Sequence, residues 1–114
     1  MTEVVDIGTG RHYLWGAASE GWHLVERADL SVIQERVPPG DRERRHVHST
    51  ARQFFYVLEG EAVLEVAGAR FALRAGQGLE VPPGAPHQFL NESARVVTFL
   101  VVSAPRAHGD RTET

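Results

Sequence analysis

Short apolar bursts with a period of two, separated by glycine and proline turns, constrain the fold of this chain more than any other feature. Alternation of apolar and polar residues over four to eight positions is typical of a β-strand with one buried face. The breaks carry turn chemistry at Pro38-Pro39-Gly40-Asp41, Glu59-Gly60, Ala67-Gly68 and Pro82-Pro83-Gly84. The rhythm predicts an all-β fold of antiparallel strands.

Eight strands follow from this pattern. They are expected at residues 30–37, 45–48, 53–58, 62–66, 70–73, 78–81, 87–91 and 96–102. A chain of 114 residues is long enough for one hydrophobic core and too short for two. We therefore expect a single domain over residues 1–114.

The two ends of the chain lack the pattern. Residues 1–25 are rich in aromatic residues and glycine without a clear period, so we expect an N-terminal arm. Such an arm could form an edge strand, cover a barrel mouth or pair with a second subunit. Residues 105–114 form a polar tail that is expected to fray at its end.

Charge and hydropathy exclude several classes of partner. The formal net charge is −3, and no basic stripe with interleaved aromatic residues is present, so we expect no nucleic acid. The one local excess of positive charge, residues 42–45, is interrupted by Glu43 and is expected to be a solvated turn. No run approaches the roughly 18 apolar residues of a membrane span, and no signal sequence is visible. A cytoplasmic location without membrane attachment is the default expectation.

Histidine spacing points to a metal site. The chain has no cysteine, so a metal ion must be held by histidine, carboxylate or amide groups. His46 and His48 lie two apart in a predicted strand, which directs both imidazoles to the same face. Gln53 and His87 each open another predicted strand, and Phe55 and Val57 should continue the inward face that Gln53 begins.

The spacing of glycine and proline residues around these side chains resembles the two signature motifs of the cupin superfamily. The first motif is met by Gly40, His46, His48, Gln53 and Gly60, with Gln53 where the family usually has Glu. The second is met at every position by Gly76, Pro82, Gly84, His87 and Asn91. Together the motifs span residues 40–91.

The resemblance implies a cupin jelly-roll barrel, or double-stranded β-helix, made of two antiparallel sheets. It also implies a homodimer and a metal ion near the wide mouth of the barrel. On the family pattern His46, His48 and His87 are metal ligands, and Gln53 occupies the fourth position.

Gln53 changes the charge of the predicted site. An amide supplies a neutral carbonyl oxygen, so the double charge of the ion is not compensated by its protein ligands. The site should therefore favour a small anionic substrate and hold its metal less tightly than a site with Glu. Direct ligation by Gln53 is favoured over a hydrogen bond to a metal-bound water. The donor set suits Zn, Ni, Fe, Mn or Co and does not choose among them.

Three functions are compatible with this site. The first is Lewis-acid catalysis by an isomerase, cyclase or lyase acting on an oxygen-rich metabolite. Three histidines with Gln also resemble small cupins acting on sugar acids, but the acidic residue those carry on the final strand is absent from residues 96–102. The second is a dioxygenase using Fe, Mn or Ni. The third is a non-catalytic domain that binds small molecules.

The general acid and base are not identified by the sequence. Candidates near the mouth are Glu35, Arg36, Tyr56, His12, His23 and His108. Each is more often a surface ion pair or a hydrogen-bonded residue of the arm than a catalytic group, and Glu35 and Arg36 point to opposite faces. Core packing is the expected role of Trp15, Trp22, Phe54, Phe55 and Phe99.

Overall fold

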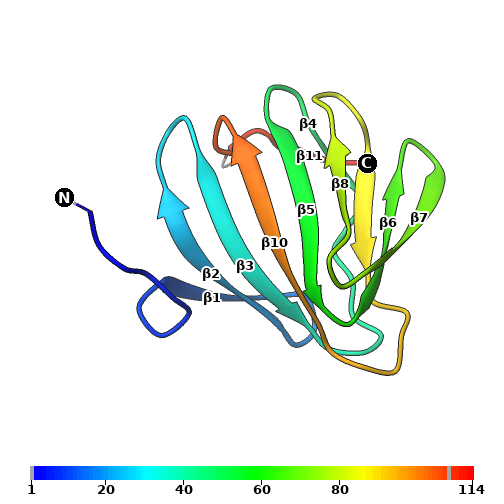
Figure 1. Cartoon of the computed structure of the whole chain (residues 1–114). Coiled ribbons are helices and arrows are strands. Elements are labelled where there is room, and N and C mark those ends of the chain that lie inside the picture. The colour runs from blue at the N-terminus through cyan, green and yellow to red at the C-terminus, as the bar shows by residue number, and fades with distance from the viewer. Residues whose placement is uncertain (1, 108) are drawn as a thin grey trace.

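The computed structural model describes residues 2–107 and 109–114, and in these residues the chain forms eleven β-strands and no helix (Figure 1). Accordingly, none of them forms a helix long and apolar enough to cross a membrane. One sheet has six antiparallel strands in the order β1-β2-β3-β10-β5-β8. Their bounds are Arg11–Trp15 (β1), Ser19–Glu26 (β2), Ser31–Val37 (β3), Val97–Ala104 (β10), Arg52–Glu59 (β5) and Gly78–Val81 (β8).

The second sheet has five antiparallel strands in the order β11-β4-β9-β6-β7. They are Arg111–Glu113 (β11), His46–His48 (β4), His87–Leu90 (β9), Glu61–Val66 (β6) and Ala69–Arg74 (β7). No pairing among the described strands joins the two sheets, so the jelly roll is a two-sheet sandwich. The all-β jelly-roll prediction is confirmed, whereas a closed barrel is wrong.

The eight predicted strands are all present, with ends that shift by at most two residues. The inward face of β5 runs through Gln53, Phe55 and Val57, as the alternation predicts. Agreement is good here because each of these strands buries one face, which fixes both its register and its pattern.

The two ends of the chain are more ordered than their composition suggests. Within the arm, β1 and β2 form a hairpin at the edge of the six-stranded sheet, which selects the edge-strand alternative. The prediction that the tail frays is wrong, because β11 pairs with β4 and the amide of Thr114 donates to Arg45 at 3.1 Å. The backbone of β4 is unpaired on that side without β11, and such an edge readily accepts another strand.

Turn geometry explains why particular glycines punctuate the pattern. Gly60 connects β5 to β6 with φ of 88°, and a Cβ there would lie 2.4 Å from the carbonyl oxygen of Val96. Any side chain at this position would therefore be both strained and obstructed. The β6–β7 hairpin turns through Ala67 and Gly68 with positive φ at both residues, the conformation that matches the twist of adjoining strands.

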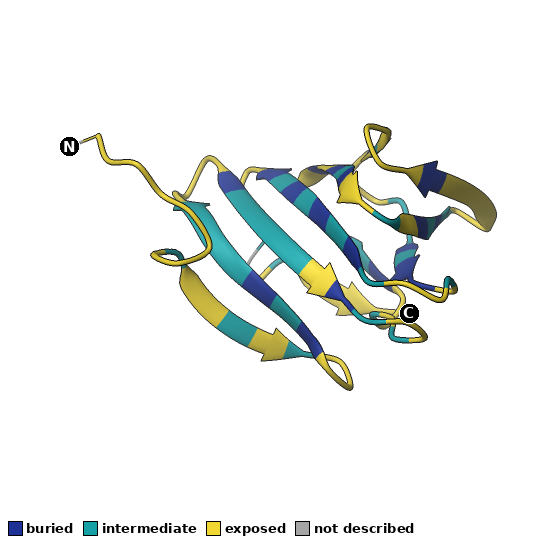
Figure 2. Ribbon diagram, turned by 60° about the horizontal axis from the view of Figure 1, so that its bottom comes forward, coloured by how far each residue is buried: buried dark blue, intermediate teal, exposed yellow. Residues whose placement is uncertain are grey.

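The hydrophobic core fills the space between the sheets. Phe89 and Phe99 are fully buried and stacked with ring centroids 3.8 Å apart, and Phe55 packs beside both. Figure 2 shows buried and partly exposed residues alternating along the strands of the six-stranded sheet. Core packing is thus confirmed for Phe55 and Phe99, whereas Phe54 lies on the outer face and is 40% exposed.

Candidate functional site

Strands β4 and β9 bring three histidines together on the inner face of the five-stranded sheet. His46 is directly opposite His87 in the β4–β9 ladder, so their side chains lie on the same face. His48 lies two residues further along β4 and shares that face. All three are buried, and a potential ligand atom from each lies within 4.8 Å of the others.

Backbone hydrogen bonds orient two of these rings. Nδ1 of His46 donates to the carbonyl of Arg44 at 2.8 Å, and Nδ1 of His87 donates to the carbonyl of Ala85 at 3.0 Å. A neutral imidazole that donates from Nδ1 keeps the lone pair on Nε2, which is the tautomer a metal ligand needs. Nδ1 of His48 is buried and has no hydrogen-bond partner among the described residues.

Gln53 lies beside this cluster, on β5 of the opposite sheet. Its Oε1 is 3.0 Å from Nε2 of His87, and its Nε2 donates to Oγ of Ser103 at 3.0 Å. Ser103 is directly opposite Gln53 in the β5–β10 ladder, which explains why it can hold the amide. The amide oxygen therefore lies within hydrogen-bonding distance of the ring nitrogen of His87 that a metal ion would take.

These residues fit a divalent transition metal ion. Two ligand atoms at right angles on an ion with bonds of about 2.1 Å are about 3.0 Å apart, the separation of Gln53 Oε1 and His87 Nε2. Burial lowers the pKa of His48 and His87, and it lowers the pKa of His46 to about 3. The imidazoles are therefore neutral at physiological pH, as ligation requires.

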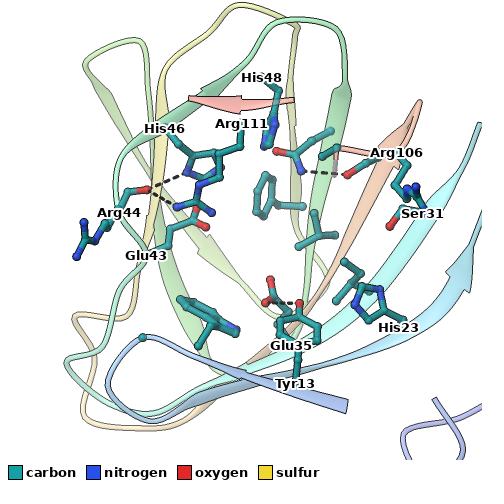
Figure 3. A pocket seen from close by; sticks show the side chains of 18 of the residues that line it. Tyr13, His23, Ser31, Glu35, Glu43, Arg44, His46, His48, Arg106 and Arg111 are labelled. Atoms are coloured by element: carbon teal, nitrogen blue, oxygen red, sulfur yellow. Dashed lines mark hydrogen bonds between the residues drawn. The ribbon is translucent and has the colours of Figure 1, made fainter. Parts of the chain in front are cut away.

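His46, His48 and Gln53 line a cavity of about 760 Å³ between the sheets. In Figure 3 His46 and His48 lie on one side of this cavity and Tyr13 and Glu35 on the other. Tyr13 Oη donates to Glu35 Oε2 at 2.9 Å. Glu43 also lines the cavity, and its Oε1 accepts a hydrogen bond from the amide of Phe89 at 3.0 Å.

Burial gives two of the cavity carboxyls, Glu35 and Glu43, near-neutral pKa values. It raises the pKa of Glu35 to about 7, although the hydrogen bond from Tyr13 opposes the shift. Burial, with repulsion from Glu35, raises the pKa of Glu43 to about 8. Burial likewise raises the pKa of Tyr13, so its hydroxyl stays protonated. A carboxyl that titrates near pH 7 is suited to transfer protons in either direction.

Several of the other candidates lie outside the cavity. His12 pairs with Glu20 at 2.9 Å, Arg36 pairs with the same Glu20 at 3.5 Å, and Tyr56 stacks on Phe54 of the outer face. Trp22 lies against His12 rather than in the core. His23 lines the cavity wall, and Trp15 both lines it and packs against the core. His108 lies outside the described residues.

Sequence reasoning missed Glu43, Tyr13, Ser103 and Arg111. Expecting residues 42–45 to be a solvated turn was wrong for Glu43, because its side chain turns inward to the amide of Phe89 while the arginines beside it remain exposed. The available signal for an inward-facing Glu43 was that it is the one acidic residue in a run with three arginines. Tyr13 and Arg111 carry no such signal, since their positions depend on how the ends of the chain pair.

Comparison with known proteins defines the class to which this chain belongs. Residues 33–103 match the sequence model of the Cupin domain family. The chain belongs to the cupin superfamily.

Three similar proteins illustrate the range of the family. "Polyketide synthase CurC" of Streptomyces cyaneus is 41% identical over 71 residues, which are 60% of this chain and 46% of CurC. Quercetin 2,3-dioxygenase of Bacillus subtilis is 29% identical over 98 residues, 83% of this chain and 29% of that protein. The chain thus spans less than half the length of these two relatives. The structure of TT1209 from Thermus thermophilus has a TM-score of 0.80 and 30% identity, covering 92% of this chain and 99% of TT1209.

Proposed function

We propose that this cupin holds one divalent transition metal ion with His46, His48, His87 and Gln53 and catalyses proton transfer on a small oxygen-rich metabolite without redox change. The reaction class is that of an isomerase, cyclase or lyase. The observation that carries the proposal is that one cavity is lined both by His46 and His48 of the histidine cluster and by two carboxyls with near-neutral pKa values.

The donor set defines what a bound ion contributes. When bound, a divalent ion supplies a Lewis acid that polarises a carbonyl group and acidifies the C–H bond beside it. All four protein groups are neutral donors, so they leave the ion its full charge. The identity of the metal, among Zn, Ni, Fe, Mn and Co, is a matter for elemental analysis.

The protein's own groups would move the proton. In its ionised form Glu35 or Glu43 accepts a proton from the carbon beside the carbonyl, and the protonated carboxyl returns it to a carbon or oxygen of the same molecule. Tyr13 holds Glu35 in place through its 2.9 Å hydrogen bond. No electron acceptor is needed, because the substrate and the product of such a transfer are at the same oxidation level.

Hydrogen exchange tests this proposal directly. Protein purified without added metal is analysed for its metal content, and 2-oxo-4-phenylbutyrate is then followed by NMR in D₂O. We expect about one bound ion per chain and protein-dependent exchange at the carbon next to the ketone. Exchange that is equally fast with the Glu35→Gln/Glu43→Gln double variant would contradict the assigned proton transfer, and absence of bound metal would contradict the assigned ligands.

A second candidate function is a dioxygenase. It is favoured by the similarity to quercetin 2,3-dioxygenase and by a donor set that also suits Fe, Mn or Ni. Oxygen consumption with the Fe(II)-loaded protein separates the two. The proton-transfer proposal expects none above the rate of free Fe(II).

A homodimer is also part of the proposal. Phe54 and Leu58, about 40% exposed, lie on the outer face of the six-stranded sheet, beside Tyr56, Leu100 and Val102. Covering such an apolar strip with a second copy would remove it from water. Light scattering after size exclusion should give twice the chain mass of 12.6 kDa, and Phe54→Glu should give the monomer.

A further inference from the structure

We propose that Arg111 binds a carboxylate of the substrate above the histidine cluster, so that the site selects carboxylate-bearing carbonyl compounds. This inference rests on the proposed function, and it names the substrate class of that site. Arg111 is the first residue of β11, the strand at the edge of the five-stranded sheet.

The register of β11 places Arg111 at the metal site. Arg111 is directly opposite His48 in the β11–β4 ladder, and Glu113 is opposite His46. Side chains of directly paired residues project from the same face of a sheet. Because His46 and His48 face the cavity, Arg111 faces it too. Figure 3 shows the side chains of His46, His48 and Arg111 together on one side of the cavity.

The guanidinium of Arg111 is held without being neutralised. Its Nη2 donates to the carbonyl of Arg44 at 3.4 Å, the same carbonyl that accepts from His46. Among the described residues, no carboxylate forms an ion pair with Arg111. Two other arginines of the cavity do have such partners, since Arg11 pairs with Glu26 at 2.7 Å and Arg44 pairs with Glu113 at 3.3 Å.

The charge of Arg111 reaches two carboxyls of the cavity. Burial raises the pKa of Glu35 and of Glu43 and Arg111 opposes the rise, so both carboxyls lie within reach of its charge. Both stay partly protonated near pH 7, however, and compensate this cation only in part. An anion entering the cavity supplies the remaining negative charge.

Asp110 fixes the start of β11. Its carboxylate accepts hydrogen bonds from Oγ of Ser49 and from the amides of Thr50 at 2.9 Å and Ala51 at 2.8 Å. These residues follow β4 directly, so the bonds tie β11 to the strand that carries His46 and His48. Arg111 is thereby positioned relative to the histidines by the backbone.

A carboxylate suits this arrangement better than a phosphate. A guanidinium offers parallel N–H groups in one plane, which match the two oxygens of a single carboxylate. A phosphate dianion is usually held by several donors, and two of the other four cavity arginines, Arg11 and Arg44, are already occupied by carboxylates. We therefore infer a substrate with one carboxylate and a carbonyl within reach of the histidines.

A matched pair of ligands tests the inference. Isothermal titration calorimetry measures the affinity of metal-loaded protein for 2-oxo-4-phenylbutyrate and for its ethyl ester, which keeps the ketone and removes the charge. The parent protein should bind the acid at least tenfold more tightly than the ester. Arg111→Gln should reduce this preference to what the ion alone contributes, and Arg111→Lys should keep more of it, because Lys retains the charge without the planar fork.

Controls separate this inference from the proposed function. Arg70→Gln removes an exposed arginine of β7 that pairs with Glu92, and this variant should keep the preference for the acid. Metal content is measured for every variant, and Arg111→Gln should keep its ion. Loss of metal from the parent protein refutes the proposed ligands, whereas an acid preference of undiminished size in metal-loaded Arg111→Gln refutes only the role of Arg111. Tighter binding of inorganic phosphate than of the acid would overturn the choice of carboxylate.

Discussion

The central region of the chain and its two ends build different halves of the same cavity. Residues 33–103, the part that matches the cupin family, supply the buried core, the three histidines and Gln53. The β1–β2 hairpin supplies Tyr13, and β11 supplies Arg111. The family region therefore contains the candidate metal ligands and the carboxyls of Glu35 and Glu43, while the ends add Tyr13 and Arg111 to the cavity lining.

The ends are also attached by a different kind of interaction. Asp41 accepts hydrogen bonds from the amides of Ala17 and Ala18 and from Oγ of Ser19, which fastens the β1–β2 turn. Asp110 does the same for β11 through residues 49–51. The central strands are stabilised by apolar burial, whereas each end is held by strand pairing and by one carboxylate that bonds to backbone amides.

The largest predicted effect sharpens this contrast in stability. Phe99→Ala removes a ring that stacks on Phe89 and is 1% exposed, and it should lower the free energy of unfolding by ~3–5 kcal/mol. Leu14→Ala, in the hairpin and 77% exposed, should change it by less than ~0.5 kcal/mol. Urea unfolding measures both, and comparable losses for the two variants would erase the distinction between centre and end.

Metal binding should depend on the central region alone. His87→Gln removes one of the three converging nitrogens and should weaken the affinity for Zn²⁺ or Ni²⁺ by at least ~100-fold, more than loss of an outer-sphere partner typically costs. His12→Gln, on β1 and paired with Glu20, should bind as the parent protein does. A competitive titration with a coloured chelator gives both affinities. Equal weakening would place a metal ligand in the hairpin.

A negative charge at position 53 should raise the affinity for the metal ion and lower the affinity for an anionic ligand. Gln53→Glu adds a negative charge beside His87, so the ion should bind roughly tenfold more tightly and the acid probe should bind more weakly. The same two titrations measure both effects, and Glu80→Gln on the exposed edge strand β8 serves as the charge control. If neither affinity changes, Gln53 is not beside the ion.

Loss of the carboxylate of Asp110 should loosen one end and leave the centre intact. Asp110→Ala removes acceptors from the amides of Thr50 and Ala51, so β11 should open more often. Hydrogen exchange of the β11 amides should accelerate by about tenfold, while exchange in β5 and β10 stays unchanged. Uniform acceleration over all strands would show that β11 and the core open as one unit.

The sequence predicted the central half of the cavity and missed the other half for a physical reason. His46, His48 and His87 are found because their spacing, their strands and the turns before them are local features. Tyr13 and Arg111 reach the site only through pairings at the sheet edges, and no alternation in residues 1–25 or 105–114 announces those pairings. Glu43 was missed because a charged neighbourhood concealed an inward-facing carboxyl.

The smallest predicted effect tests the cavity carboxyls through the pH dependence of stability. Glu43 has a pKa of about 8 in the folded protein against an ordinary value of 4.5, so between these values the folded state keeps a proton that the unfolded state has lost. Stability must therefore fall as pH rises through this window. The buried histidines act oppositely, since their lowered pKa values cost stability only as pH falls below about 6.5. Measurements from pH 7 to 9 thus isolate the carboxyls.

Over that range Glu43→Gln should lose less thermal stability than the parent protein, by ~1 kcal/mol or roughly 4 °C in Tm. Glu61→Gln, an exposed control at the start of β6, should keep the parent slope because its carboxyl does not face the cavity. An identical slope in all three proteins would mean that Glu43 is ionised throughout this range. Of the two carboxyls with a near-neutral pKa, Glu35 would then be left to exchange protons near pH 7, and it accepts a hydrogen bond from Tyr13 of the terminal hairpin.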